Sequence, residues 1–287
     1  MLAQTVALLA AVCHALGFIF CTRGLRRSTP ITLTFVSLLV QTVVLFGIVL
    51  TYTGIPNTSG LLFSIYVISG IMQALIRQLT FIGIEKIGAA RSGPIRASVP
   101  LWSAAIAILF LGERMTVAIG TGTLLVVGGI LLISWQADET IKDFHPWYIA
   151  APLLAAILGG LTYPLRRYAL RFSHEQIYFG AIIGIVGFLC VCIYLALPST
   201  KERLVWNRAS LGYFIAGGAL ESLGLLLVFY ALTFGPVILV TPMTATLPLW
   251  VVLGGKFFLR DVEKITPRIV AGAALVVAGT IAMALAR

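Results

Sequence analysis

The chain has 287 residues, of which 60% are apolar and only 10% are Asp, Glu, Lys or Arg, with a formal net charge of +10. A soluble globular domain carries about 25% charged residues, so this composition excludes an ordinary soluble protein. The basic residues do not form an aromatic-interleaved patch, which argues against nucleic acid as a partner. Apolar runs of about 20 residues recur along the chain and predict an integral, multi-pass membrane protein.

Ten predicted spans follow one another with short links. In chain order they cover residues 2–22, 31–53, 60–84, 92–111, 116–135, 147–165, 175–197, 210–233, 236–258 and 266–286. No basic residue precedes the first run, which favours a span over a signal peptide. Lys and Arg are more frequent after the odd-numbered spans, so the positive-inside rule predicts both termini outside the cytoplasm, although the basic residues after the sixth span favour the reverse.

The two halves of the chain repeat each other. LTFIGIEKIGAARSGPIRASVPLWSAAIAILFLGER (79–114) aligns with LVFYALTFGPVILVTPMTATLPLWVVLGGKFFLRDV (227–262), and the glycines of the next span also match. Residues 1–144 and 145–287 are therefore predicted to be two five-span repeats, the second inverted because five is odd. Inverted repeats place substrate sites at the repeat interface near the bilayer midplane. The expected fold is an all-α membrane protein with ten transmembrane helices around a central cavity.

Matched prolines interrupt the fourth predicted span of each repeat. PIRASVPLW (94–102) and PMTATLPLW (242–250) share the pattern. A proline inside a helix removes one backbone hydrogen bond and bends the axis. In lipid, such a break is tolerated where protein or a water-lined cavity satisfies the freed groups. Hinges in two cavity-facing helices are therefore predicted at Pro94, Pro100, Pro242 and Pro248, while simple tolerance of proline by membrane helices remains the alternative.

These features resemble the drug/metabolite transporter superfamily, of the EamA type. GAARSGPIRASVPLWSAAIAILFLGERMT (88–116) is similar to the family's repeat signature, which closes on a Gly-Glu-Arg turn, here Gly112, Glu113 and Arg114. The second half departs from it, with Arg260 and Asp261 where Gly-Glu is expected. The resemblance implies ten helices around a cavity that moves small metabolites or drugs by alternating access, and it leaves the substrate open.

Three charged residues lie well inside predicted spans: Arg77, Arg96 and Glu221. A charge at the bilayer centre costs roughly 2.5–3.5 kcal/mol, so such residues usually face a cavity or a partner. The structural alternative is an ion pair of Glu221 with Arg77 or Arg96 that only holds helices together. One carboxylate cannot compensate two guanidinium groups, so an arginine would remain for an anion.

Polar residues accompany these charges on the same helical faces. Gln73 shares a face with Arg77 and aligns with Glu221, whereas Arg96 shares one with Ser92 and aligns with Thr244. The expected substrate-binding residues are therefore Arg96, Glu221, Arg77, Gln73, Thr244 and Ser92, with Tyr163 and Trp102 as further cavity candidates. Glu221 and the intramembrane His14 are candidates for ion coupling, because carboxyl and imidazole groups can carry protons.

This site predicts a secondary transporter of a small metabolite that bears a carboxylate or phosphate. Guanidinium binds such groups bidentately, and an amino acid would place its carboxylate on Arg96 and its amine on Glu221. The alternative is a proton-coupled exporter of cationic amphipathic drugs, with Glu221 as the cation and proton site. Competition by carboxylates or by organic cations would separate the two.

Other classes and partners find little support. The spans hold no paired carboxylates, no histidine cluster and no nucleophile with a base motif, so an enzyme is not expected. The sequence has no Gly-x-x-x-x-Gly-Lys-Ser/Thr loop, which argues against ATP-driven transport. A channel or a lipid flippase stays open as an alternative, and saturable counterflow would favour a carrier. The four cysteines lack metal-ligand spacing, and no cofactor or metal is expected. The expected partners are the substrate and the lipid bilayer, and the Gly180-x-x-x-Gly184 pattern leaves a homodimer open. Compact links fit a bacterial cytoplasmic (inner) membrane.

Overall fold

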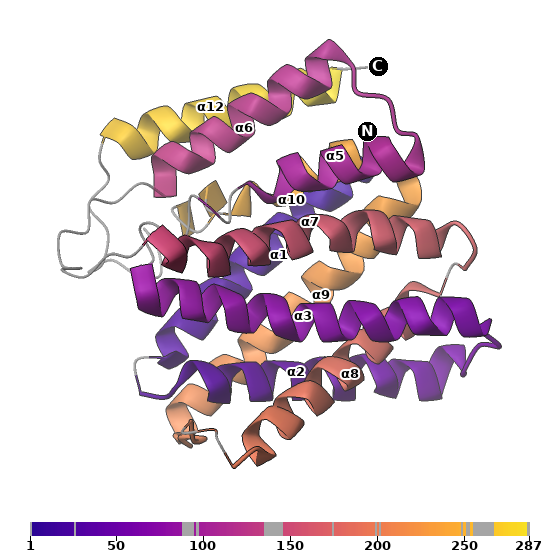
Figure 1. Ribbon diagram of the computed structural model, residues 1–287, viewed down its shortest axis with the longest axis vertical. Helices are drawn as coiled ribbons and strands as arrows, with labels where there is room; N and C mark the ends of the chain where they lie inside the picture. The colour runs from indigo at the N-terminus through magenta and orange to yellow at the C-terminus, as the bar shows by residue number, and fades with distance from the viewer. Residues whose placement is uncertain are drawn as a thin grey trace.

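The computed structural model describes residues 2–25, 27–87, 95, 98–134, 146–173, 175–198, 200, 202–247, 249–250, 253–254 and 267–285. These residues form a helical bundle (Figure 1). The first half contains α1 (Leu2–Leu25), α2 (Pro30–Ile48) continued by a π-helical turn (Val49–Thr53), α3 (Gly60–Ile87), α5 (Val99–Leu111) and α6 (Val117–Ser134). The second half contains a 3-10 turn (Pro146–Ile149), α7 (Ala150–Leu170), α8 (Gln176–Ala196), α9 (Arg208–Phe234), α10 (Val237–Thr244) and α12 (Pro267–Leu285).

The helices of the described residues confirm the prediction of a helical membrane protein. Six helices in the described part are long and apolar enough to cross a bilayer, namely α1, α2, α3, α7, α8 and α9. Shorter apolar segments lie in α5, α6 and α12. The number of ten spans therefore stays a prediction. Figure 1 shows α1 beginning and α12 ending at the same end of the bundle.

Proline, glycine and polar residues define several helix ends. Thr29 caps α2 by accepting from the Thr32 backbone N–H, with Pro30 at the first turn, and Asn207 caps α9 in the same way. Gly112 ends α5 with a φ of 66°, a left-handed conformation that suits glycine.

The predicted hinge prolines take different positions in the helices. Pro100 occupies the first turn of α5, where a missing backbone N–H costs no helical hydrogen bond. Pro242 lies inside α10, which ends two residues later at Thr244. Pro94 and Pro248 lie outside the described residues. The hinge role of these prolines stays a prediction.

The packing of the two halves follows a pseudo-two-fold pattern. Helix α1 packs on α9, and its repeat counterpart α7 packs on α3. In the same way, α2 contacts α9 while α8 contacts α3, and α1 contacts α10 while α7 contacts α5. The pairs α2–α8, α5–α10 and α6–α12 join counterparts directly. These contacts between the halves therefore occur in repeat-related pairs or join counterparts, as expected for a duplicated unit that packs against its own copy.

Helices α6 and α12 form a close-packed pair side by side at one edge of the bundle (Figure 1). A Cβ atom at Gly129 would lie 2.5 Å from the carbonyl oxygen of Gly272. A Cβ atom at Gly279 would lie 2.6 Å from the carbonyl oxygen of Gly122. The repeat-matched glycines therefore allow backbone contact between these helices, because only hydrogen fits in the gap.

Candidate functional site

Charged and amide side chains gather in the middle of the bundle, where helices from both halves meet. We call this set the polar cluster; it consists of Ser37 and Gln41 on α2, Gln73 and Arg77 on α3, Arg166 on α7 and Glu221 on α9. Gln73, Arg77 and Glu221 were expected from the sequence. Ser37, Gln41 and Arg166 join them in the structure.

An ion pair joins the two halves at this cluster. Arg77 Nη2 lies 2.7 Å from Glu221 Oε2, and Arg77 Nη1 donates to Ser37 Oγ at 2.8 Å. The side chains of Arg77 and Glu221 are 25% and 27% exposed. Of the two pairings that the sequence allowed for Glu221, the one with Arg77 is therefore formed in this structure.

A chain of amides leads from this region to Arg166. Gln41 Nε2 donates to the Gly180 carbonyl at 3.0 Å, and Gln73 Nε2 donates to Gln41 Oε1 at 3.3 Å. Gln73 Oε1 then accepts from Arg166 Nη2 at 3.5 Å, a long and weak contact. These partners determine which atom of the Gln41 and Gln73 side-chain amides is the nitrogen and which is the oxygen. The contact between Gln73 and Arg166 is weak.

Arg166 is the residue that the sequence prediction missed. The prediction ended the sixth span at residue 165 and placed Arg166 in a link, which is wrong because α7 continues to Leu170. Arg166 is 7% exposed, and its guanidinium carbon lies 5.3 Å from the ring centre of Phe229. A signal was present: Arg166 follows Tyr163 by three residues, so the two share a helical face.

Arg166 is under-compensated in its surroundings. Its Nε atom is buried and has no hydrogen-bond partner. Among the described residues no carboxylate forms an ion pair with it, and the cation–π contact with Phe229 supplies only partial stabilisation. The polar cluster thus holds two guanidinium groups and one carboxylate, and its net charge is positive.

Of the remaining candidates, Tyr163 and Thr244 lie beside each other. Tyr163 Oη is 3.3 Å from Thr244 Oγ1, which links α7 to α10. Trp102 on α5 is 36% exposed, and its Nε1 donates to Ser98 Oγ, so no described polar contact joins Trp102 to the cluster. Arg96 and Ser92 lie outside the described residues.

His14 lies on α1 beside α9, near the ion pair. A Cβ atom at Gly224 would lie 2.9 Å from three atoms of the His14 ring, so the imidazole packs directly on the α9 backbone. Glu221 precedes Gly224 by three residues on α9, so the two share a helical face. The structure therefore brings together the two residues expected to take part in ion coupling.

A second contact between the halves lies away from the cluster, at the start of α10. The carboxylate of Glu113 accepts from the backbone N–H groups of Val237 at 2.9 Å and Ile238 at 3.1 Å. A carboxylate at a helix N-terminus accepts hydrogen bonds from backbone N–H groups that have no partner within the helix. Its negative charge also interacts favourably with the positive end of the helix dipole. Nearby, Arg167 donates to the carbonyl oxygens of Leu232 and Thr233 at the end of α9. Glu113 and Arg167 thus bind the backbone where α9 ends and α10 begins, a junction that we call the α9–α10 corner.

Helices of membrane length with a charged cluster between the two halves define the class, a multi-pass helical membrane protein. The family model described as the EamA-like transporter family matches residues 1–135 and 145–285. The chain therefore belongs to the EamA-like transporter family and is a membrane transporter of small solutes.

Comparison with curated proteins gives no match. Among solved structures, a crystal structure described only as that of a protein superposes with a TM-score of 0.82 at 16% sequence identity, over 99% of this chain and 96% of the other. At that identity the likeness shows a shared fold alone.

Proposed function

We propose that this transporter is a secondary carrier that moves a small metabolite bearing a carboxylate or phosphate, with amino acids as the leading candidates, by alternating access. The observation that supports the anion is Arg166: it is buried, its Nε has no partner, and no described carboxylate forms an ion pair with it.

The argument rests on charge compensation. Arg77 has Glu221 and Ser37 as partners, whereas Arg166 has one weak contact with Gln73. A buried charge without a counter-charge is costly, and an incoming anion removes that cost. A carboxylate or phosphate can engage Arg166 through two parallel N–H groups. Arg96, the anion anchor expected from the sequence, remains a further candidate among the residues outside the described part.

The same cluster supports a zwitterionic substrate. The Glu221 side chain is 27% exposed, and Arg77 binds its Oε2 atom. In this proposal the other carboxylate oxygen, Oε1, accepts from the amine of the substrate. Tyr163 lies on the Arg166 face of α7 and adds a hydroxyl, with Thr244 beside it. An amino acid would then place its carboxylate on Arg166 and its amine toward Glu221.

Alternating access requires a contact that differs between two states. The Arg77–Glu221 pair joins α3 of the first half to α9 of the second, so relative motion of the halves would break or reshape it. Glu221 also remains the candidate for proton coupling, with His14 next to it, and the matched prolines remain the candidate hinges. Each of these roles is part of the proposal.

The alternative is export of cationic amphipathic drugs through Glu221. A cation would have to displace the Arg77 guanidinium from the carboxylate and enter a cluster whose net charge is positive. The charge balance therefore favours an anion or a zwitterion.

Counterflow in proteoliposomes tests the proposal. Vesicles preloaded with unlabelled amino acids, other carboxylates, phosphorylated metabolites or organic cations are assayed for uptake of the labelled compound. We expect saturable counterflow for an anionic or zwitterionic solute. Arg166→Gln should abolish it, and Arg171→Gln, at the exposed C-terminal end of the same helix, should retain it. Counterflow of organic cations alone, unchanged in Arg166→Gln, would contradict the proposal.

A further inference from the structure

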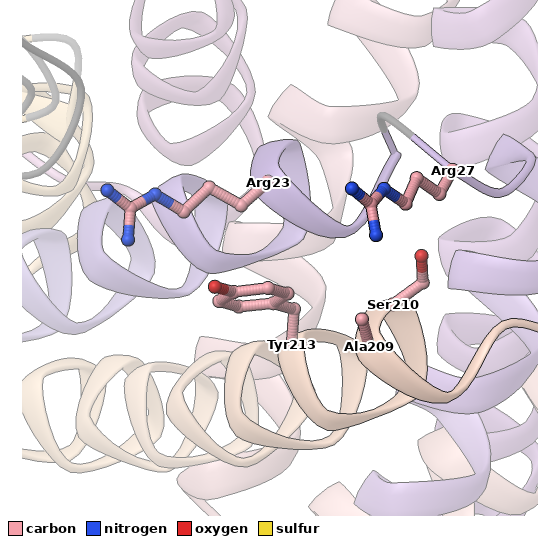
Figure 2. A pocket seen from close by; sticks show the side chains of 5 residues that line it. All are labelled: Arg23, Arg27, Ala209, Ser210 and Tyr213. Atoms are coloured by element: carbon pink, nitrogen blue, oxygen red, sulfur yellow. The ribbon is translucent and has the colours of Figure 1, made fainter.

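A second basic site lies at one end of the bundle, between α1 and α9. A cavity of about 450 Å³ is lined there by Arg23, Arg27, Ala209, Ser210 and Tyr213. Figure 2 shows the Ser210 hydroxyl directed toward the Arg27 side chain, while Arg23 and the Tyr213 hydroxyl both extend to the left, away from Arg27. The cavity falls within the size range of small-molecule sites.

The lining is suited to an anion. It contains two guanidinium groups and two hydroxyls, and none of its five described residues is acidic. The first turn of α9 contributes Ala209 and Ser210, so the cavity also faces the positive end of a 27-residue helix. Their backbone N–H groups already donate to Asn207 Oδ1, at 3.0 and 3.3 Å. Direct hydrogen bonds to an anion would therefore come from the side chains, with the helix end adding to the field.

The aromatic wall is held in place by packing. The Tyr213 ring centre lies 6.3 Å from that of Phe20 on α1, in a tilted arrangement. Phe214, the next residue, is almost fully buried, and a Cβ atom at Gly24 would lie 2.4 Å from its ring. The two helices are therefore in close contact next to the residues that line the cavity.

The cavity lies at the ends of two helices of membrane length, where a membrane–water boundary is expected. It lies where α1 ends and α9 begins, and both helices are of membrane length. The loop that leads into α9 is tied to the start of α2, because Ser28 Oγ donates to the Val205 carbonyl at 2.7 Å and the Val205 N–H donates to Thr32 Oγ1 at 2.9 Å. Trp206 in this loop is 59% exposed and packs edge-on against Phe35. Exposed tryptophans are typical of the headgroup level.

We propose that this cavity is a phosphate-binding site, which takes either the headgroup phosphate of an anionic lipid or the phosphate of a soluble metabolite. Basic pockets between transmembrane helices are suited to lipid phosphates, and guanidinium forks match the geometry of phosphate oxygens. The site is separate from the polar cluster: Glu221 lies about 12 Å further along α9 than Tyr213, at 1.5 Å per residue.

The test uses the full chain and two probes. Native mass spectrometry in a zwitterionic detergent measures retained phosphatidylglycerol against phosphatidylcholine, and thermal stabilisation measures binding of glycerol 3-phosphate. The pocket variant is Arg23→Gln with Arg27→Gln, and the charge-matched control is Arg171→Gln with Arg203→Gln, two exposed arginines that do not line the cavity. We expect affinity for at least one phosphate probe to fall about tenfold in the pocket variant and to persist in the control. A tenfold loss of affinity corresponds to roughly one charge-assisted hydrogen bond.

The outcomes separate the source of the phosphate. Loss of lipid retention alone assigns a headgroup site, loss of glycerol 3-phosphate binding alone assigns a soluble ligand, and loss of both assigns a site that accepts either. If neither probe binds, or if the pocket and control variants lose binding equally, the proposal is wrong. Should the pocket variant fail to fold, Tyr213→Phe serves in its place, with a smaller expected loss. Arg166→Gln should leave phosphate binding here intact, which keeps this inference distinguishable from the proposed transport function.

Discussion

Arg77 and Glu221 lie 2.7 Å apart and connect the third helix of the first repeat to the third helix of the second. Both side chains are about one-quarter exposed, so the pair is shielded from bulk solvent without being sealed from it. A pair of this kind is expected to favour the conformation in which it forms and to be replaced by other contacts when the two halves rearrange.

Removing either partner of this pair should destabilise the protein. Arg77→Gln and Glu221→Gln each leave the opposite charge without its partner, whereas the double variant removes both charges. We expect the double variant to lose less unfolding free energy than the sum of the two single losses, with a coupling of about 0.5–3 kcal/mol, measured by denaturant titration in detergent. Strictly additive losses would show that the pair contributes nothing to this conformation.

The carboxylate of Glu113 should stabilise the α9–α10 corner. Glu113→Ala removes the acceptor of two backbone N–H groups at the start of α10, at Val237 and Ile238, and is expected to cost about 0.5–2 kcal/mol. Glu175→Ala is the control, since Glu175 occupies the N-cap position of α8 without a side-chain capping bond. Thermal unfolding should place the Glu113 variant clearly below the Glu175 variant. Equal midpoints would mean that the Glu113 contact has no energetic weight.

Substitution of Gly129 should disturb the α6–α12 contact, whereas substitution of its neighbour Gly128 should not. Gly129→Ala places a methyl group 2.5 Å from the Gly272 carbonyl oxygen, so the helices must separate, with an expected cost of about 1–3 kcal/mol. Gly128→Ala meets nothing within 4 Å and should be neutral or slightly stabilising, because alanine is the better helix former. Equal effects on the thermal midpoint would contradict the close backbone contact.

A similar pair of variants tests the position of His14. Gly224→Ala on α9 brings a methyl group within 2.9 Å of the His14 ring, and the ring must move. Gly212→Ala on the same helix meets nothing within 4 Å. We expect Gly224→Ala to lower both the thermal midpoint and proton-driven uptake, and Gly212→Ala to leave uptake unchanged. Unaltered uptake in Gly224→Ala would remove His14 from the proposed coupling pathway.

Much of the fold could be predicted from the sequence because lipid restricts the possibilities. A chain that crosses a bilayer must satisfy its backbone within helices, so apolar runs translate directly into spans. The glycines of the fifth and tenth predicted spans aligned as part of the repeat, and the structure adds that they lie in the α6–α12 contact, where Gly122 and Gly129 meet Gly279 and Gly272.

The candidate site was less predictable, because it depends on neighbours distant in the sequence. Hydropathy ends a span where charges begin, so it placed Arg166 in a link, although α7 continues and buries it against Gln73 of α3 and Phe229 of α9. The partner of Glu113 was equally hidden, since Val237 lies in the other half of the chain. Arg77 and Glu221 were found because a charge inside an apolar run is visible locally.

Ligand-induced thermal stabilisation of the purified protein, with Arg166→Gln and the control Arg171→Gln, tests the central claim most directly. A ligand that binds the folded state raises the midpoint by mass action. The proposed function predicts stabilisation by an amino acid, another carboxylate or a phosphorylated metabolite, lost in Arg166→Gln and kept in Arg171→Gln. Stabilisation by organic cations alone, equal in all three proteins, would contradict an anion site at Arg166 and make Glu221 the centre of a cation site.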